Sequence, residues 1–255
     1  MCFGEVDHFA TMVAGCENIS SGNILTLDGK YATAVLKLHA QPNNSIIHGN
    51  EGFIDTVKRG ANSIKEWFLS LLKAIGNFLK EITGRNKKQR EEDARAILKQ
   101  KEAVDKQKAD EYEEKLIEVF KASFAEPLRL SEQVYQDVQS SGYLDSDTFR
   151  VLNLGNMRID SGFSAIKALN FEAKDVADSD TKDVVRELDH LEKAIDVLVR
   201  QSEQEVNKWA DDDVQEAQRS DIAKAAFLLK KFTQVYGWYE DGLNRYYKNA
   251  AKIKP

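Results

Sequence analysis

The sequence has little cysteine, proline or glycine: 2, 3 and 14 residues of 255. Two cysteines cannot form a disulfide framework in a chain of this length, which favours a reducing compartment. Residues that break helices are scarce, so an all-β fold with many turns and a disordered chain are both disfavoured. The rest of the composition, 42% hydrophobic and 31% charged, is typical of a helical protein with one or two domains.

Long apolar runs and an excess of basic residues are also missing. The longest nearly continuous apolar run, residues 67–72, is far shorter than the ~20 residues that span a bilayer. No basic residue precedes Lys30, so the positive region of a secretory signal is absent. The net charge of −6 argues against a general nucleic-acid binder. We therefore expect a chain that is neither secreted nor membrane-spanning.

Signatures of metal binding and of catalysis are absent as well. Cys2, His8 and Cys16 are spaced unlike the cysteines and histidines of compact zinc motifs. The acidic residues around 178–183 lack the glycine and the further ligands of a calcium loop. The sequence contains no G-x-S-x-G motif and no glycine-rich phosphate loop. We therefore expect no catalytic residue, no metal, no cofactor and no small-molecule substrate.

Charge and helix-breaking residues divide the chain into three parts, residues 1–51, 52–125 and 126–255. The middle part carries a net positive charge and the flanking parts a net negative charge. Glycines near residue 50 mark the first boundary. Pro127 marks the second boundary and is expected to end the helix that precedes it.

The N-terminal part has two interpretations. Residues 24–27 and 30–38 flank Asp28-Gly29, a pair that tolerates the positive φ angles of a two-residue hairpin turn. A short β-hairpin is therefore one interpretation. The other makes residues 32–38 one or two turns of helix.

The clearest helix in the sequence is predicted over residues 53–83. Apolar residues recur there at alternating spacings of four and three, with basic and polar residues on the opposite side. Gly84 is expected to cap the helix. We name the apolar stripe the 57–82 seam; it consists of Val57, Ala61, Ile64, Phe68, Leu71, Ile75, Phe78 and Ile82, with Trp67 beside it. Such a stripe is typical of a helix packed against protein, and also of a helix lying in a membrane interface.

A second, highly charged helix with few apolar residues is predicted over residues 85–118, laced by ion pairs between residues four apart. A basic cluster lies at its start, directly after the seam. Its members are Arg85, Lys87, Lys88 and Arg90. They are candidates for contact with an anionic surface, either phosphate or lipid. Acidic residues 91–93 follow directly and cancel much of this charge. A solvated linker is therefore the alternative, and any contact with nucleic acid would be non-specific.

Residues 126–255 are expected to form a helical bundle. A looser helical stretch is predicted over residues 146–170, interrupted near Gly155 and Gly162. Two long apolar seams, over residues 184–209 and 222–250, then predict an antiparallel helical hairpin. The predicted fold class is thus mainly α: an elongated helical bundle with a long antiparallel hairpin and a small N-terminal segment.

The stretch Gly49-Asn50-Glu51-Gly52, together with the helix that follows it to residue 73, resembles internal virion and prohead-core proteins of large tailed bacteriophages. In those families a short acidic N-terminal segment ends in small-x-Glu before Gly or Ala, where the prohead protease cuts. The resemblance implies processing between Glu51 and Gly52. It also implies a non-enzymatic protein packaged in, or built into, a phage particle.

Together these observations favour a non-enzymatic helical assembly protein in a virion or in the host cytoplasm. Its expected partners are further copies of itself or other virion proteins, bound through helix–helix contacts along the seams. One alternative is a membrane-active protein that uses the helix over residues 53–83 during delivery or lysis. Another is a helical inhibitor or regulator of a host protein.

Overall fold

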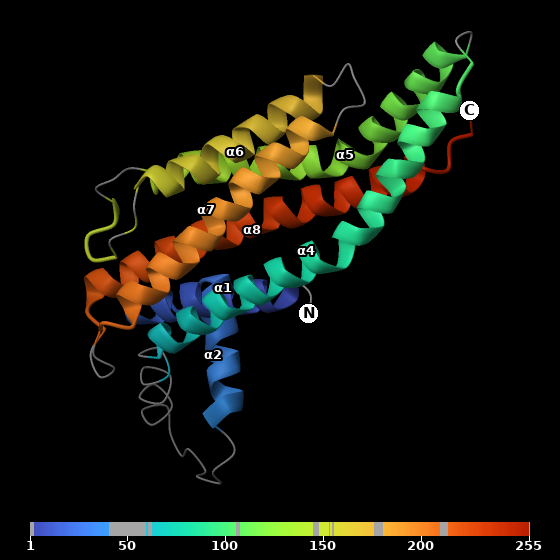
Figure 1. The fold of residues 1–255 in the computed structure, drawn as a ribbon. Helices are drawn as coiled ribbons and strands as arrows, with labels where there is room; N and C mark the ends of the chain where they lie inside the picture. Colours follow the sequence, from blue (N-terminus) through green and yellow to red (C-terminus); the bar gives the residue numbers. More distant parts are fainter. Residues whose placement is uncertain are drawn as a thin grey trace. The chain divides into compact units, whose positions relative to one another are not determined.

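The computed structural model describes residues 3–40, 60, 63–105, 108–144, 148–152, 154, 156–175, 181–209 and 214–254. Long helices dominate these residues, and no strand occurs among them. The mainly α-helical fold class is therefore confirmed. The helices, labelled in Figure 1, are α1 (Phe3–Ser20), α2 (Leu27–Ala40), α4 (Ile64–Ala103), α5 (Ala109–Ser140), α6 (Asn156–Asp175), α7 (Lys182–Val206) and α8 (Glu216–Ala250).

The N-terminal segment forms two helices, so the β-hairpin interpretation of residues 24–38 is wrong. Gly22 ends α1 with a φ of 82°, and its N–H donates to the Ile19 carbonyl at 3.2 Å. This is the left-handed C-cap for which glycine is suited. The Thr26 hydroxyl then accepts the N–H of Gly29 at 3.0 Å and caps α2. Asp28 and Gly29 therefore lie in the first helical turn, where an acidic side chain suits the helix dipole.

Helix α4 continues through Gly84 to Ala103, so the predicted end of the helix at residue 83 is wrong. A glycine inside a helix costs only ~1 kcal/mol. The lysines, glutamates, glutamines and alanines that follow favour helix strongly enough to offset this cost. The basic cluster consequently lies on a helix and not in a linker. The predicted start at residue 53 falls outside the described residues.

Helix α5 contains Pro127 in its interior and ends only at Ser140, so the predicted stop at Pro127 is wrong too. Proline has no N–H, which deprives the Ser123 carbonyl of its helical donor. Arg245 of α8 replaces that donor, because its Nη2 donates to the Ser123 carbonyl at 3.2 Å. Figure 1 shows α5 changing direction along its length, as a helix with an internal proline does.

Helix α6 likewise continues through Gly162, where an interruption was predicted. The ring of Phe232 packs against this glycine: a Cβ added there would lie 2.6 Å from the Phe232 Cε2 atom. Gly162 therefore allows a close approach to an aromatic ring and does not end the helix. Gly155 falls outside the described residues.

The chain forms two compact units, each assembled from separate segments. Unit 1 comprises Met1–Phe78, Asp145–Asn156 and Val197–Lys230. Unit 2 comprises Leu79–Leu144, Met157–Asp196 and Lys231–Pro255. The predicted division at residues 51 and 125 follows the order of the chain, whereas each unit takes segments from both halves of it.

Unit 1 contains the contact between α1 and α2, and apolar residues from several helices fill its core. The Lys65 ammonium donates to the Trp209 carbonyl at 2.7 Å, and Lys230 pairs with Asp7 at 2.6 Å. The fully buried apolar side chains include Val6, Met12, Val13, Cys16, Ile64, Phe68, Leu71, Ile75, Val206 and Ile222.

Unit 2 is a helical bundle in which its parts of α7 and α8 run antiparallel. Tyr247 shares a hydroxyl–hydroxyl hydrogen bond of 2.6 Å with Thr181. Tyr236, earlier in α8, donates to Glu192, later in α7, at 3.2 Å. This order agrees with the predicted antiparallel hairpin. Buried side chains include Leu116, Phe120, Phe124, Ile166, Leu169, Leu191, Ile195, Phe232 and Tyr239.

Candidate functional site

The described part of the 57–82 seam is mostly buried. Ile64, Phe68, Leu71 and Ile75 are fully buried, and Phe78 is 6% exposed. These five residues belong to unit 1. The seam therefore contributes to this unit's own core.

The partner of the seam in unit 1 includes α1. The ring of Phe78 lies edge-on to Phe3 at 5.8 Å between centroids, and half-buried Trp67 lies 6.2 Å from Phe9. Ile82 is half-buried. Val57, Ala61 and the predicted processing site Glu51–Gly52 fall outside the described residues. Because the chain's own helices already cover the described seam residues, these residues are not an exposed surface for other molecules.

The predicted basic cluster lies on α4, in unit 2. Arg90 is ion-paired with Glu240 of α8, at 2.9 Å between Nη2 and Oε2. The two side chains are 18% and 6% exposed. Lys88 is exposed, and Arg85 and Lys87 lie on the same helix. Arg90 is thus engaged inside the protein, and contact of the other three with an anionic surface stays a prediction.

An exposed apolar surface occurs instead on α2, in unit 1. Its members, which we name the outer face of α2, are Leu27, Tyr31, Ala34 and Leu38. Their spacing of four, three and four residues places them on one side of the helix. Leu27 is 86% exposed and Leu38 69% exposed. Ile24 and Leu25, just before α2, are exposed as well.

The opposite side of α2 packs against α1. Ala32 is fully buried there and Leu36 is 7% exposed. Tyr31 reaches α1 from the edge of the outer face, because its hydroxyl shares a hydrogen bond of 2.6 Å with His8 Nδ1 and its ring lies edge-on to the His8 ring. The other members, Leu27, Ala34 and Leu38, are exposed within the described residues. The outer face was not predicted from the sequence, because residues 24–38 were interpreted as a hairpin, and a helix places those residues on different sides.

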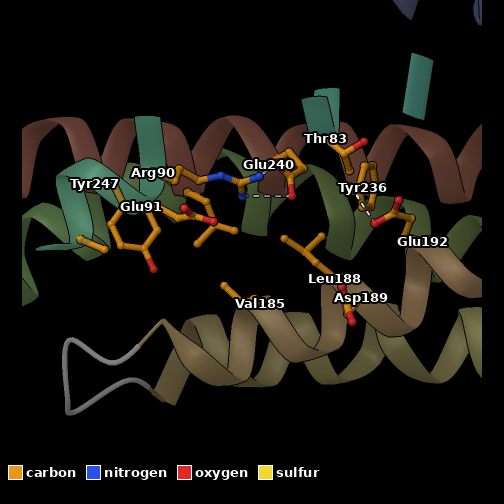
Figure 2. Close-up of a pocket in the computed structure, with 12 residues that line it drawn as sticks. Thr83, Arg90, Glu91, Val185, Leu188, Asp189, Glu192, Tyr236, Glu240 and Tyr247 are labelled. Atoms are coloured by element: carbon orange, nitrogen blue, oxygen red, sulfur yellow. Dashed lines mark hydrogen bonds and ion pairs between the residues drawn. The ribbon is translucent and has the colours of Figure 1, made fainter. Parts of the chain in front are cut away.

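A second feature is a pocket of about 490 Å³ inside unit 2. Figure 2 shows it between α4, α7 and α8, with the Arg90–Glu240 ion pair along one side. Apolar side chains from α7 and α8 complete the walls: Val185, Leu188 and Leu243. Its volume is in the range of small-molecule sites, ~300–1,000 Å³.

Carboxylates and tyrosines lie toward both ends of this pocket. Figure 2 shows Glu91 and Tyr247 toward one end, and Glu192 and Tyr236 toward the other. Asp189 also lines the pocket, but it is ion-paired with Lys193 at 3.0 Å. The acidic groups outnumber the single lining cation, Arg90.

Burial changes the acidity of the groups in the pocket. It raises the pKa of Glu240, an effect that the adjacent Arg90 guanidinium partly opposes. Burial also raises the pKa of Glu192, and the hydrogen bond from Tyr236 partly opposes that change. The pKa of Tyr236 is raised first by burial and then by the two carboxylates. The pocket thus holds carboxylates that are costly to ionise and gain from a cationic neighbour.

Two further reactive side chains, Cys16 and His190, do not line the pocket. Burial raises the pKa of the Cys16 thiol to about 12, so little nucleophilic thiolate forms at neutral pH. His190 is half-exposed and lies 3.1 Å from the Glu187 carboxylate. Across the described residues, no three His, Cys, Asp or Glu side chains gather in a way that could hold a metal ion.

Glu192, Tyr236 and Glu240 were not predicted as site residues from the sequence. One signal was available: Glu240 interrupts the apolar seam of α8, four residues after Tyr236 and three before Leu243. A glutamate on a buried stripe is normally paired. Its partner could not be named from the sequence, because Arg90 is 150 residues away along the chain.

None of the described helices has an apolar stretch long enough to cross a bilayer. Comparison of the chain with protein-family models, curated proteins and solved structures gave no match.

Proposed function

We propose that this chain is a non-enzymatic helical assembly protein that self-associates through the outer face of α2. The resemblance of residues 49–73 to internal virion proteins supplies the proposed setting, the interior of a bacteriophage head. The observation that carries the proposal is the exposure of Leu27 and Leu38, at 86% and 69%, on one side of a helix whose other side is packed.

Exposed apolar surface of this kind is typical of an interaction site. Burying a Leu side chain is worth ~1.5–3 kcal/mol, and contiguous exposed apolar patches mark binding surfaces. Regularly spaced apolar side chains on a helix are also the anchors by which helices dock onto one another.

A second copy of α2 fits this face well. If two copies cross antiparallel about the midpoint of the face, Leu27 lies opposite Leu38 of the second copy. The same arrangement sets Tyr31, whose hydroxyl is bonded to His8 of its own chain, opposite the small Ala34. Such a self-complementary surface is what a two-fold symmetric interface requires.

The charges beside the outer face predict how salt affects this association. Lys30 is exposed and lies on one flank of the face. The two-fold arrangement brings this flank of each copy beside the same flank of the other. Added salt screens the resulting repulsion, so dimerisation is expected to strengthen with ionic strength. Binding to an anionic membrane would weaken instead.

The membrane-active alternative has less support than self-association. It relied on the helix over residues 53–83, and the described seam residues Ile64–Phe78 are covered inside unit 1.

Processing between Glu51 and Gly52 is compatible with the proposal. The cut would separate α1 and α2 from the rest of the chain covalently, but the packing of Phe3 and Phe9 against α4 would remain. N-terminal sequencing of the native protein tests this point, since cleavage at the predicted site gives a start at Gly52.

The experiment that tests self-association is sedimentation velocity over a range of protein and salt concentrations. The wild-type chain should dimerise, and the double variant Leu27→Glu/Leu38→Glu should be monomeric. Leu98→Glu is the matched control, because Leu98 is 60% exposed on α4 and lies outside the outer face. A wild-type chain that stays monomeric at its highest soluble concentration, or a double variant that dimerises normally, contradicts the proposal.

A further inference from the structure

The pocket in unit 2 has a chemical character that self-association does not explain. The buried carboxylate of Glu240 lies along its side, and Glu91 and Glu192 lie toward its two ends. Apolar side chains lie between these ends, and all the lining residues come from α4, α7 and α8. Its residues belong to one compact unit.

The Arg90–Glu240 pair leaves a charge pattern that favours a cation. Arg90 neutralises Glu240, to which it also donates from Nη1 at 3.2 Å. Glu91 and Glu192 are not ion-paired with any side chain that the structure describes. The pocket therefore keeps an excess of negative charge at both ends after its own pair is counted.

A buried oxygen in the pocket also has hydrogen-bonding capacity to spare. Glu240 Oε2 lies 2.9 Å from Arg90 Nη2, yet it accepts no aligned hydrogen bond from a described group. Its side chain is only 6% exposed. A buried acceptor in this state is costly unless a further donor reaches it.

The middle of the pocket is apolar. Figure 2 shows Val185 and Leu188 between the two carboxylate ends, opposite the Arg90–Glu240 pair. Val185 is 41% exposed, which leaves the wall accessible from solvent. Methylene groups would bury against these side chains, whereas an inorganic cation would gain nothing from them.

We propose that this pocket binds a linear aliphatic diamine or polyamine. One ammonium group lies at the Glu91–Tyr247 end and the other at the Glu192–Tyr236 end. The alkyl chain between them covers Val185 and Leu188. The tyrosine rings add cation–π attraction, and each ammonium group supplies Glu91 or Glu192 with a cationic hydrogen-bond partner.

Isothermal titration calorimetry of the full chain with spermidine and 1,4-diaminobutane tests this site. Butylamine, which has one ammonium group, and 1,4-butanediol, which has none, are the matched ligands. Spermidine and 1,4-diaminobutane should both bind measurably. Butylamine should bind at least about tenfold more weakly than 1,4-diaminobutane, and 1,4-butanediol should not bind. Absence of binding by spermidine, or equal binding of butylamine and the diamine, overturns the proposal.

Variants locate the binding within the pocket. Glu91→Gln and Glu192→Gln should each weaken spermidine binding by at least about tenfold. Glu203→Gln, an equal loss of charge at an exposed position of α7 in unit 1, should leave it unchanged. Equal losses in all three variants would show non-specific attraction to the acidic surface and overturn the proposal.

A second variant avoids the carboxylates altogether. Val185→Lys should place a tethered ammonium group at the apolar wall and abolish spermidine binding, with the far-UV circular dichroism unchanged. Retained binding in this variant would contradict the assignment. The Leu27→Glu/Leu38→Glu variant should bind spermidine normally, so that spermidine binding and self-association are tested independently of each other.

Discussion

A single carboxylate holds residues 148–152 against α8 in unit 1. Asp221 is 1% exposed, and its Oδ2 accepts the N–H groups of Val151 at 2.7 Å and Leu152 at 2.9 Å. Lys224, one turn later, lies 3.6 Å from the same carboxylate and donates to the Thr148 carbonyl at 2.8 Å. These side chains supply hydrogen-bond partners for backbone N–H and C=O groups that lie outside helices and sheets.

Replacing Asp221 with Ala should therefore destabilise the protein by about 2–4 kcal/mol, since the buried N–H of Leu152 and the part-buried N–H of Val151 lose their acceptor. Urea unfolding followed by circular dichroism measures the loss. Asp189→Ala serves as the control; its carboxylate is 61% exposed in a pair with Lys193, so its effect should stay below about 0.5 kcal/mol. Equal effects in the two variants would argue against this role of Asp221.

The raised pKa of Glu192 gives the protein a definite pH dependence. Because burial raises this pKa above its ordinary value of 4.5, the folded state binds the proton more tightly than the unfolded state. The stabilisation is complete below 4.5 and is lost as the pH rises through the folded-state pKa.

Glu192→Gln should accordingly raise the melting temperature at pH 8, where the wild type carries a buried charge, and give no gain near pH 4.5. Differential scanning calorimetry across this range measures the difference, with Glu203→Gln as the exposed control. An increase at pH 8 that persists unchanged at pH 4.5 would mean that ionisation of Glu192 is not the cause.

At the scale of elements, one glycine sets how closely α1 and α2 approach. A Cβ added to Gly15 would lie 2.3 Å from the Asp28 carbonyl oxygen and 2.4 Å from the Ala32 Cβ atom. Neither neighbour is the end of a flexible side chain. Gly84 in α4 differs, because an added Cβ there would meet nothing within 4 Å.

The same substitution should therefore have opposite effects at the two positions. Gly15→Ala is expected to destabilise the protein by about 1–3 kcal/mol by overpacking. Gly84→Ala is expected to stabilise it by up to ~1 kcal/mol through helix propensity. Chemical denaturation of both variants gives the comparison, and a stabilising Gly15→Ala would show that α1 and α2 can separate at little cost.

The helices themselves were largely predictable from the sequence, and their ends were not. Apolar spacing identified the stripe from Ile64 to Phe78 and the seams of α7 and α8, because burial imposes that period locally. The ends at Gly84 and Pro127 were wrong for a different reason. At Gly84 the helix-favouring residues that follow offset the cost of the glycine. At Pro127 the compensating hydrogen bond comes from Arg245, which is distant in the chain.

The candidate sites were less predictable than the fold. The outer face of α2 depends on whether residues 27–38 form a helix or a strand, and the Thr26 cap decides this locally. The pocket depends on Arg90, Glu192 and Glu240 from three helices. Glu192 and Glu240 are ordinary charged residues in the sequence, and Arg90 was predicted to contact an anionic surface and not a glutamate of its own chain.

At the scale of the whole molecule, the two units are interleaved along the chain. Helices α4, α7 and α8 each supply residues to both units. Within unit 1, the residues from α8 include Lys230, which pairs with Asp7. Within unit 2, they include Tyr236 and Glu240.

Removal of residues 214–255 should therefore disrupt both units and not one. Far-UV circular dichroism should show a loss of helix well beyond that of α8, and amide resonances should lose their dispersion. Co-expression of the missing segment should restore both signals. A truncated chain that keeps one unit folded would contradict this dependence.

The Ser123 carbonyl links two positions in α5 and α8 that are otherwise far apart in the chain. Arg245 donates to that carbonyl in place of the backbone N–H that Pro127 lacks. In a library randomised at both positions and selected for folding, arginine at 245 should be enriched among clones that keep proline at 127. Clones with alanine at 127 should accept many residues at 245. Positions 127 and 245 would then covary, because both act on the Ser123 carbonyl, without any requirement for contact between their side chains.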